Sequence, residues 1–135
     1  MTPRTARSIR LLMPPVYEAF HTLHTDRYLA YARAHLDDAA AQAAVQSALG
    51  TIATHWPYIV AQAHPAAIAW EQLVATTGSR THPLPADTTS PLHYDALILH
   101  TLGYTAHSIA EATGTHPTTV HCLLHPHKRE HHDPT

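Results

Sequence analysis

The chain is poor in cysteine, glycine and charge. Of its 135 residues, one is cysteine, four are glycine, and charged side chains make up 13%. The single cysteine, Cys122, rules out a disulfide within the chain and fits a reducing compartment, for which the cytoplasm is our default expectation. No apolar run approaches the ~20 residues that a membrane-spanning helix needs, so we expect no membrane partner.

Apolar residues recur at helical spacing, and the sequence predicts no strand. We therefore predict an all-α protein. Its predicted parts are a flexible arm over 1–13 without a secretory signal, three helices over 14–78, a Pro- and Thr-rich linker over 79–90, a second helical domain over 91–128 and a tail over 129–135. Lobes this small have marginal cores, so packing against each other or against a second copy of the chain is expected.

The helix boundaries and the buried stripes follow from the same pattern. Asp37 and Asp38 suit a helix start, Pro65 suits a first helical position, Pro57 ends or bends a helix and Gly78 suits a helix end. The side chains that we predict to be buried are Val16, Phe20, Leu23, Tyr28, Tyr31, Val45, Leu49, Ile52 and Trp56 in the first domain and Leu92, Ala96, Leu99, Leu102, Ile109, Ala110, Val120 and Leu124 in the second.

The stretch from Gly103 to His125 has the spacing of a helix-turn-helix. Ala110 is small where two helices must cross closely, and Gly114 supplies the backbone freedom of a sharp turn. Val120 then points back between the helices, while Pro117 fits the first position of the second helix. Each residue meets a separate geometric demand, so the sequence predicts this motif. A helix-turn-helix can also serve only to pack two helices together, so the motif alone does not establish DNA binding.

Taken in order, these parts resemble the extracytoplasmic-function sigma factors of the sigma-70 family. The resemblance covers about residues 16 to 128. The C-terminal family motif, G-Y-S-x-x-E-I-A-x-x-x-G-x-S-x-G-T-V-K-S-R-L, is matched at Gly103, Tyr104, Thr105, Ile109, Ala110, Gly114, Thr119, Val120 and Leu124. The N-terminal motif is echoed at Tyr31, Ala32, Asp37 or Asp38, Ala41, Val45, Gln46 and Leu49.

This resemblance implies a role in transcription initiation. The N-terminal helices would bind core RNA polymerase or another transcription protein, and the second helix of the helix-turn-helix would read promoter DNA in the major groove. The DNA-binding candidates are Thr105, Thr118, Thr119, His121, Cys122, His125 and Lys128. The polymerase- or partner-binding candidates are Asp37, Asp38, Gln42 and Gln46. Trp70 would be a DNA-stacking candidate by resemblance, although its place on an apolar stripe indicates a core residue.

Permanent positive charge is scarce where that role would need it. The family's reading helix continues K-S-R-L-x-R-A-R, but between His121 and Lys128 only the lysine is permanently charged, and Pro126 stops the helix early. Residues 91–135 hold two basic and four acidic side chains, which is unfavourable for independent DNA binding. Two interpretations stay open: a divergent, active sigma factor, or a degenerate sigma-like module that binds a protein partner or its own copy, with weak or no DNA binding.

Fifteen histidines raise the question of a metal site or a pH response. His121 and His125 lie four residues apart beside Cys122, a spacing that can chelate zinc, but no companion glutamate follows and the other histidines are scattered. We therefore expect no metal and no cofactor, whereas protonation near pH 6 would restore part of a basic face. The chain has no glycine-rich phosphate loop and no nucleophile elbow, so we predict that the protein is not an enzyme.

Overall fold

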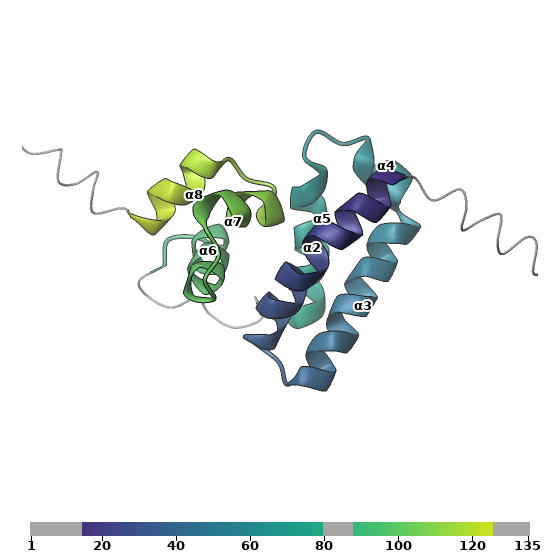
Figure 1. Cartoon of the computed structure of the whole chain (residues 1–135), viewed down its shortest axis with the longest axis horizontal. Coiled ribbons are helices and arrows are strands. Elements are labelled where there is room, and N and C mark those ends of the chain that lie inside the picture. Colours follow the sequence, from purple (N-terminus) through teal and green to yellow (C-terminus); the bar gives the residue numbers. More distant parts are fainter. Residues whose placement is uncertain (1–14, 80–87, 126–135) are drawn as a thin grey trace, which may run out of the picture.

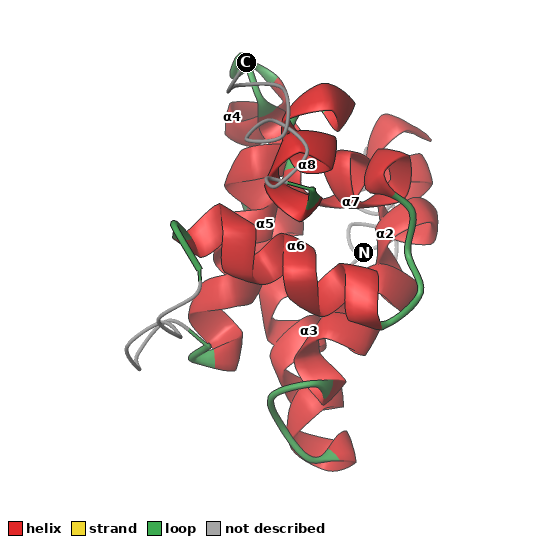
Figure 2. Ribbon diagram, turned by 90° about the vertical axis from the view of Figure 1, so that its left-hand side faces the viewer, coloured by secondary structure: helices red, strands yellow, loops and turns green. Residues whose placement is uncertain are grey.

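The computed structural model describes residues 15–79 and 88–125, where helices are joined by short loops and no strand occurs (Figures 1 and 2). The first stretch contains α2 (Pro15–Arg33), α3 (Asp38–Thr54), α4 (Trp56–Val60) and α5 (Pro65–Thr77). The second contains α6 (Pro91–Thr101), α7 (Ala106–Thr113) and α8 (Pro117–Leu124). The all-α prediction is confirmed, whereas the predicted arm and tail, most of the linker, and Lys128 lie outside the described residues.

Prolines and side-chain caps set the helix boundaries. The Asp37 carboxylate accepts a hydrogen bond from the Ala40 N–H at 2.8 Å and so caps α3. Ser90 caps α6 in the same way, through the His93 N–H at 3.1 Å. Gly78 ends α5 with a left-handed backbone, φ 69°. Prolines open four helices, at Pro15, Pro65, Pro91 and Pro117. The boundaries predicted at Asp37, Pro65 and Gly78 are therefore confirmed.

An aromatic cluster lies at the centre of the first half, where α2, α3 and α5 pack together. Trp70 on α5 makes edge-on contacts with Tyr28 and Tyr31 of α2, at ring-centroid distances of 5.6 Å and 4.8 Å. All three side chains are buried. Each such aromatic pair contributes about 0.5–1.5 kcal/mol beyond the burial of its area, so this cluster fixes α2 against α5.

The buried face of α2 differs from the predicted one. Val16 and Leu23 are 59% and 47% exposed, and Phe20 is half-buried. The inward face consists of Tyr17, His24, Tyr28 and Tyr31. Val16 and Leu23 each lie one residue, or about 100° of helix rotation, away from this face. The prediction chose the more apolar neighbours, but the Tyr17 hydroxyl is satisfied inside by donating to the Leu49 carbonyl oxygen at 3.3 Å.

The remaining core predictions are largely confirmed, with differences at three leucines of the second half. Leu102 is 44% exposed, because it follows the end of α6 and leaves the stripe that Ala96 and Leu99 continue. Leu92 and Leu124 are half-buried rather than buried. The confirmed buried residues are Tyr28, Tyr31, Val45, Leu49, Ile52, Trp56, Ala96, Leu99, Ile109, Ala110 and Val120.

The two halves of the chain pack against each other. Helices α6 and α7 contact α2 and α5, and buried residues of both halves belong to one hydrophobic cluster. Figure 1 shows α7 facing α5 between the two halves, with α8 on the far side of α7 from α3. The expected packing of one lobe on the other is confirmed, and it places the helix-turn-helix in fixed contact with the first half.

Candidate nucleic-acid interface

Helices α7 and α8 and the turn at Gly114 form the predicted helix-turn-helix. Gly114 adopts a left-handed backbone with φ 73°, and after it the Thr115 N–H donates to the Ala110 carbonyl oxygen at 2.9 Å. Ala110 is 2% exposed and Val120 is fully buried, so the two helices cross closely at these positions, as predicted. Pro117 is the first residue of α8.

The candidate DNA-binding residues of α8 divide into an exposed and a half-buried set. Thr118, Thr119 and His121 are exposed, and together they define what we call the outer face of α8. Cys122 and His125 are half-buried. The rings of His121 and His125 lie against each other, with centroids 4.7 Å apart. The structure therefore brings these five candidates together on one short helix and the residue that directly follows it.

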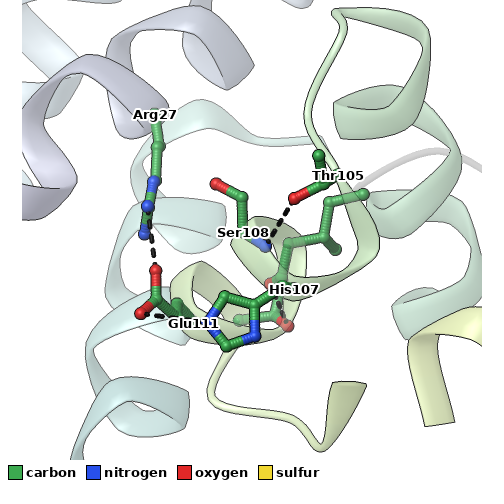
Figure 3. A network of polar contacts seen from close by, with 7 residues as sticks. Arg27, Thr105, His107, Ser108 and Glu111 are labelled. Atoms are coloured by element: carbon green, nitrogen blue, oxygen red, sulfur yellow. Dashed lines mark hydrogen bonds and ion pairs between the residues drawn. The ribbon is translucent and has the colours of Figure 1, made fainter. Parts of the chain in front are cut away.

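Thr105 lies elsewhere, at the start of α7. Its side-chain oxygen accepts the Ser108 N–H at 3.1 Å and caps that helix (Figure 3). The residue is exposed, so its hydroxyl proton remains available for donation to an external acceptor.

The outer face of α8 carries no permanent charge. Residues 88–125 contain neither lysine nor arginine. Their two carboxylates face the rest of the chain: Asp95 is fully buried, and Glu111 is ion-paired with Arg27. Lys and Arg contacts to phosphates, which release counterions and dominate the affinity of most DNA-binding proteins, are therefore missing from this described stretch.

The partner-binding candidates lie at the start of α3. Asp38 Oδ1 accepts from Arg33 Nε at 2.8 Å, and its Oδ2 accepts from Gln42 Nε2 at 3.1 Å. Asp37 is occupied as the helix cap, and Gln46 is exposed one turn farther along. In both Figure 1 and Figure 2 this end of α3 is at the bottom and α8 is near the top, so the two candidate surfaces are far apart.

A set of contacts between the halves was not predicted. We call it the seam, and it is made by Arg27, Tyr31, Ala67 and Trp70 of the first half with Asp95, Glu111 and Gly114 of the second. Its centre is the Asp95 carboxylate. The Tyr31 hydroxyl donates to Oδ1 at 2.6 Å, and Trp70 Nε1–H donates to Oδ2 at 2.9 Å. Hydrogen bonds to a charged group contribute about 1.5–3 kcal/mol each, so this one carboxylate ties α6 to both α2 and α5.

The same contact fixes the protonation of Tyr31. Burial first, and the Asp95 charge second, raise the pKa of its phenol far above the ordinary value. The hydroxyl therefore keeps its proton, which it donates to Asp95, and its oxygen accepts a hydrogen bond from the Ser79 hydroxyl at 2.9 Å.

A second tie joins α2 to α7. Arg27 Nη2 lies 2.9 Å from Glu111 Oε1, and Figure 3 shows the Arg27 side chain reaching down from α2 to that carboxylate. His107 Nε2 lies 3.7 Å from the other oxygen of Glu111. The side chains of Arg27 and Glu111 are 14% and 41% exposed, so solvent screens this pair only in part.

The turn of the helix-turn-helix also touches the first half. A Cβ atom added at Gly114 would lie 2.2 Å from the Ala67 nitrogen and 2.8 Å from the Ala66 carbonyl carbon. Only glycine permits this approach, because the neighbouring atoms are backbone of α5 and cannot rotate away. Gly114 therefore has two roles: its left-handed backbone makes the turn, and its missing side chain lets the turn dock on α5.

His24 lies next to the Arg27–Glu111 pair. The residue is 4% exposed, and its ring lies tilted against Phe20 at a centroid distance of 4.5 Å. Burial first, and the positive charge of Arg27 second, lower the pKa of His24 from 6.5 to about 4, and the Glu111 charge opposes this only in part. The buried ring is therefore neutral at pH 7.

The structure removes Trp70 from the list of exposed DNA-stacking candidates. The side chain is 2% exposed and its indole N–H is hydrogen-bonded to Asp95, so Trp70 is a core residue.

The sequence did contain a signal that Asp95 is buried. It lies three residues after Leu92 and four before Leu99, so a helical wheel places this carboxylate on the buried stripe. A charge in that position needs a partner from another element.

No protein-family model, curated protein or solved structure matches this chain. Within residues 15–79 and 88–125, no three His, Cys, Asp or Glu side chains gather closely enough to hold a metal ion. None of the described helices combines the length and apolar character that crossing a membrane requires.

Proposed function

We propose that this protein is a sigma-factor-like transcription regulator that contacts promoter DNA through α8 and binds core RNA polymerase through the first half. One observation carries the DNA-binding part. Val120 anchors one side of α8 in the crossing with α7, while Thr118, Thr119 and His121 project from the other side into solvent. A helix held in this way is the arrangement by which helix-turn-helix proteins enter the major groove.

The chemistry of the outer face suits weak contacts to the DNA backbone and to bases. Thr118 and Thr119 belong to the first turn of α8, where backbone N–H groups without helical partners and side-chain hydroxyls can donate to phosphate oxygens. His121 follows within reach of the same groove and can donate or accept. Such contacts orient a helix on DNA, but without Lys or Arg they contribute little affinity.

Binding would therefore depend on a second contact, which the first half would supply. Linking two weak contacts on one body makes the second one intramolecular and raises the overall affinity by about 10²–10⁴. The start of α3, with Asp38 and Gln42 hydrogen-bonded to each other and Gln46 exposed, is the proposed polymerase contact. Its distance from α8 leaves both surfaces free to engage at once (Figure 1).

A second candidate function is supported by the absence of lysine and arginine from residues 88–125. On that reading the fold is a degenerate sigma-like interaction module that binds a protein partner or its own copy. Exposed threonines and histidines are compatible with either kind of surface.

A salt titration of promoter-DNA binding separates the two. The full chain is titrated with promoter DNA at several salt concentrations, alone and with core RNA polymerase. The proposed regulator should bind polymerase saturably, and affinity for DNA should fall linearly with log salt in the polymerase complex. If the chain binds polymerase but does not bind DNA at any salt concentration, the result would favour the interaction module.

Substitutions locate the contact. Thr118→Glu with Thr119→Glu places two negative charges on the outer face and should abolish DNA binding. Thr22→Glu places one such charge at an exposed position of α2 and should leave DNA binding unchanged. Equal effects of the two changes would contradict a role for α8.

A further inference from the structure

We infer that His121 and His125 form a proton-dependent phosphate clamp on α8: when α8 binds DNA, the two imidazole rings together take up a proton and hold one phosphate of the DNA backbone. The affinity for DNA is therefore coupled to pH. This inference rests on the proposed function and identifies the charge with which α8 would bind phosphate.

The two rings lie against each other on one side of α8. His121 and His125 are about one helical turn apart, and their ring centroids are separated by 4.7 Å. Counted around the helix from the buried Val120, His121 is turned by about 100°, His125 by about 140° and Thr118 by about 160°. An α-helix with its side chains is about 10–12 Å wide, which is close to the width of the major groove, so side chains on its flanks meet backbone phosphates.

The charge of α8 is that of its histidines. Residues 117–125 contain no Lys, Arg, Asp or Glu. Histidine is the side chain whose charge ordinarily changes between pH 5 and pH 8, so the charge of this helix depends on pH in that range. His121 belongs to the last turn of α8 and His125 directly follows the helix. The partial negative charge at the C-terminus of a helix stabilises nearby cations, so this end of α8 is suited to a protonated ring.

The neighbouring carboxylates are already engaged. Helix α8 packs on α6 and α7. The ionisable side chains of these two helices and of the loop between them are His93, Tyr94, Asp95, His100, Tyr104, His107 and Glu111. On α8 itself, the half-buried Cys122 lies between the two histidines. Both carboxylates of this set belong to the seam: Asp95 accepts hydrogen bonds from α2 and α5, and Glu111 pairs with Arg27. A positive charge on the clamp can therefore attract an external anion.

A bound phosphate would make protonation of the pair more favourable. Two like charges at this separation repel, so a proton on one ring disfavours a proton on the other. A phosphate group that contacts both rings attracts both charges and accepts a hydrogen bond from the N–H of each. DNA binding and protonation then reinforce each other, and each proton taken up per complex changes the affinity roughly tenfold per pH unit.

Substitutions separate the charge of the clamp from other effects of pH. The double variant His121→Gln with His125→Gln removes both titrating rings but keeps polar side chains. His121→Lys places a permanent positive charge at the same position. His55→Gln is the control for the loss of an exposed histidine elsewhere: His55 joins α3 to α4, and Figure 1 shows α4 and α8 on opposite sides of the molecule. All solutions contain EDTA, so that a metal ion bound by the rings cannot contribute.

The affinity of the polymerase complex for promoter DNA is measured at pH 6 and pH 8, each at several salt concentrations. The unchanged chain and His55→Gln should bind DNA roughly tenfold more tightly at pH 6 than at pH 8. The double variant should lose most of this difference, whereas His121→Lys should bind at pH 8 about as tightly as the unchanged chain does at pH 6. At pH 6 the plot of log affinity against log salt should be steeper by about one unit in the unchanged chain than in the double variant, as expected for one phosphate contact.

Three results would overturn the clamp and leave the proposed function intact. The double variant could bind DNA with the pH dependence of the unchanged chain, which would place the titrating groups elsewhere. His121→Lys could bind DNA no more tightly at pH 8 than the unchanged chain, or His55→Gln could lose the pH dependence to the same extent as the double variant. Circular dichroism at both pH values confirms that each variant is folded. If no form binds DNA at either pH in the presence of polymerase, the proposed function itself fails, and the clamp fails with it.

Discussion

The seam and the outer face of α8 are two polar surfaces of the second half, and they differ in charge and in exposure. At the seam, Asp95 is buried and accepts two short hydrogen bonds, and Glu111 pairs with Arg27. On the outer face of α8 the side chains are exposed hydroxyls and an imidazole. Both carboxylates of residues 88–125 are therefore directed at the chain itself, and none is on the outer face.

This difference separates what holds the molecule together from what it offers to others. Buried, charge-assisted hydrogen bonds are directional and specify one docking arrangement of α6 on α2 and α5. Exposed hydroxyls specify little and tolerate change. We therefore expect substitutions at the seam to lower the free energy of unfolding strongly, and substitutions on the outer face to change binding but not stability.

The largest loss of stability is expected at Gly114. Gly114→Ala places a Cβ atom 2.2 Å from the Ala67 nitrogen, on a backbone with φ 73°. The clash with backbone atoms and the left-handed strain together should lower the free energy of unfolding by about 4 kcal/mol, measured by urea denaturation. Gly78→Ala is the matched control: its φ is 69°, but no atom lies within 4 Å, so only the strain of about 1 kcal/mol remains. Equal losses of stability in the two variants would show that Gly114 is not in close contact with the backbone of α5.

The second largest loss of stability is expected for Asp95→Ala. The change leaves the buried Tyr31 hydroxyl without its carboxylate and removes the acceptor of the Trp70 N–H. Removing the shared acceptor of these two buried groups should lower the free energy of unfolding by about 3 kcal/mol. Tyr94→Phe serves as the control on the same helix, because it removes only the half-buried hydrogen bond to His35, worth about 1 kcal/mol. A loss at Asp95 no larger than this control would contradict the central role of the carboxylate.

A pH dependence is expected from His24, at the edge of the seam. Its folded-state pKa of about 4 lies below the ordinary 6.5. As the pH falls from 6.5 towards 4, the unfolded chain gains a proton that the folded chain does not, so stability is lost over this window. This effect of His24 should lower the free energy of unfolding by about 2 kcal/mol at pH 4.5 relative to pH 7. Urea denaturation at pH 7 and pH 4.5 measures it.

Other groups also titrate over this range, so the comparison is with His24→Phe. The variant keeps a ring against Phe20 and should lose about 2 kcal/mol less between the two pH values than the unchanged chain. Identical pH profiles of stability for the two chains would show that folding does not lower the pKa of His24.

Local patterns were sufficient to predict the turn of this fold and its helices except α4, since three helices were predicted over 14–78 and the structure has four there. The Asp37 cap, the prolines and the glycines act within a few residues of themselves, so their consequences can be read along the chain. The helix-turn-helix was predicted for the same reason, since the demands on Ala110, Gly114 and Val120 are local. The face of α8 that is exposed followed from Val120 being buried.

The seam could not be predicted, because its partners are far apart in sequence. Sixty-four residues separate Tyr31 from Asp95, and eighty-four separate Arg27 from Glu111. The position of Asp95 on an apolar stripe indicated that it needed a donor, but not which one. The same uncertainty explains the error on α2, where Val16 and Leu23 were preferred to Tyr17 and His24: a polar aromatic side chain is buried only if another element satisfies it.

The smallest effect on stability is expected on the outer face of α8. Thr119→Ala removes an exposed hydroxyl for which the structure shows no hydrogen bond within the chain, so the free energy of unfolding should change by less than about 0.5 kcal/mol. DNA affinity of the polymerase complex should nevertheless fall, because the hydroxyl is one of few donors on that face. A loss of stability comparable to that of Asp95→Ala would mean that Thr119 is part of the folded core. The distinction between a surface that holds the halves together and a surface that binds would then no longer stand.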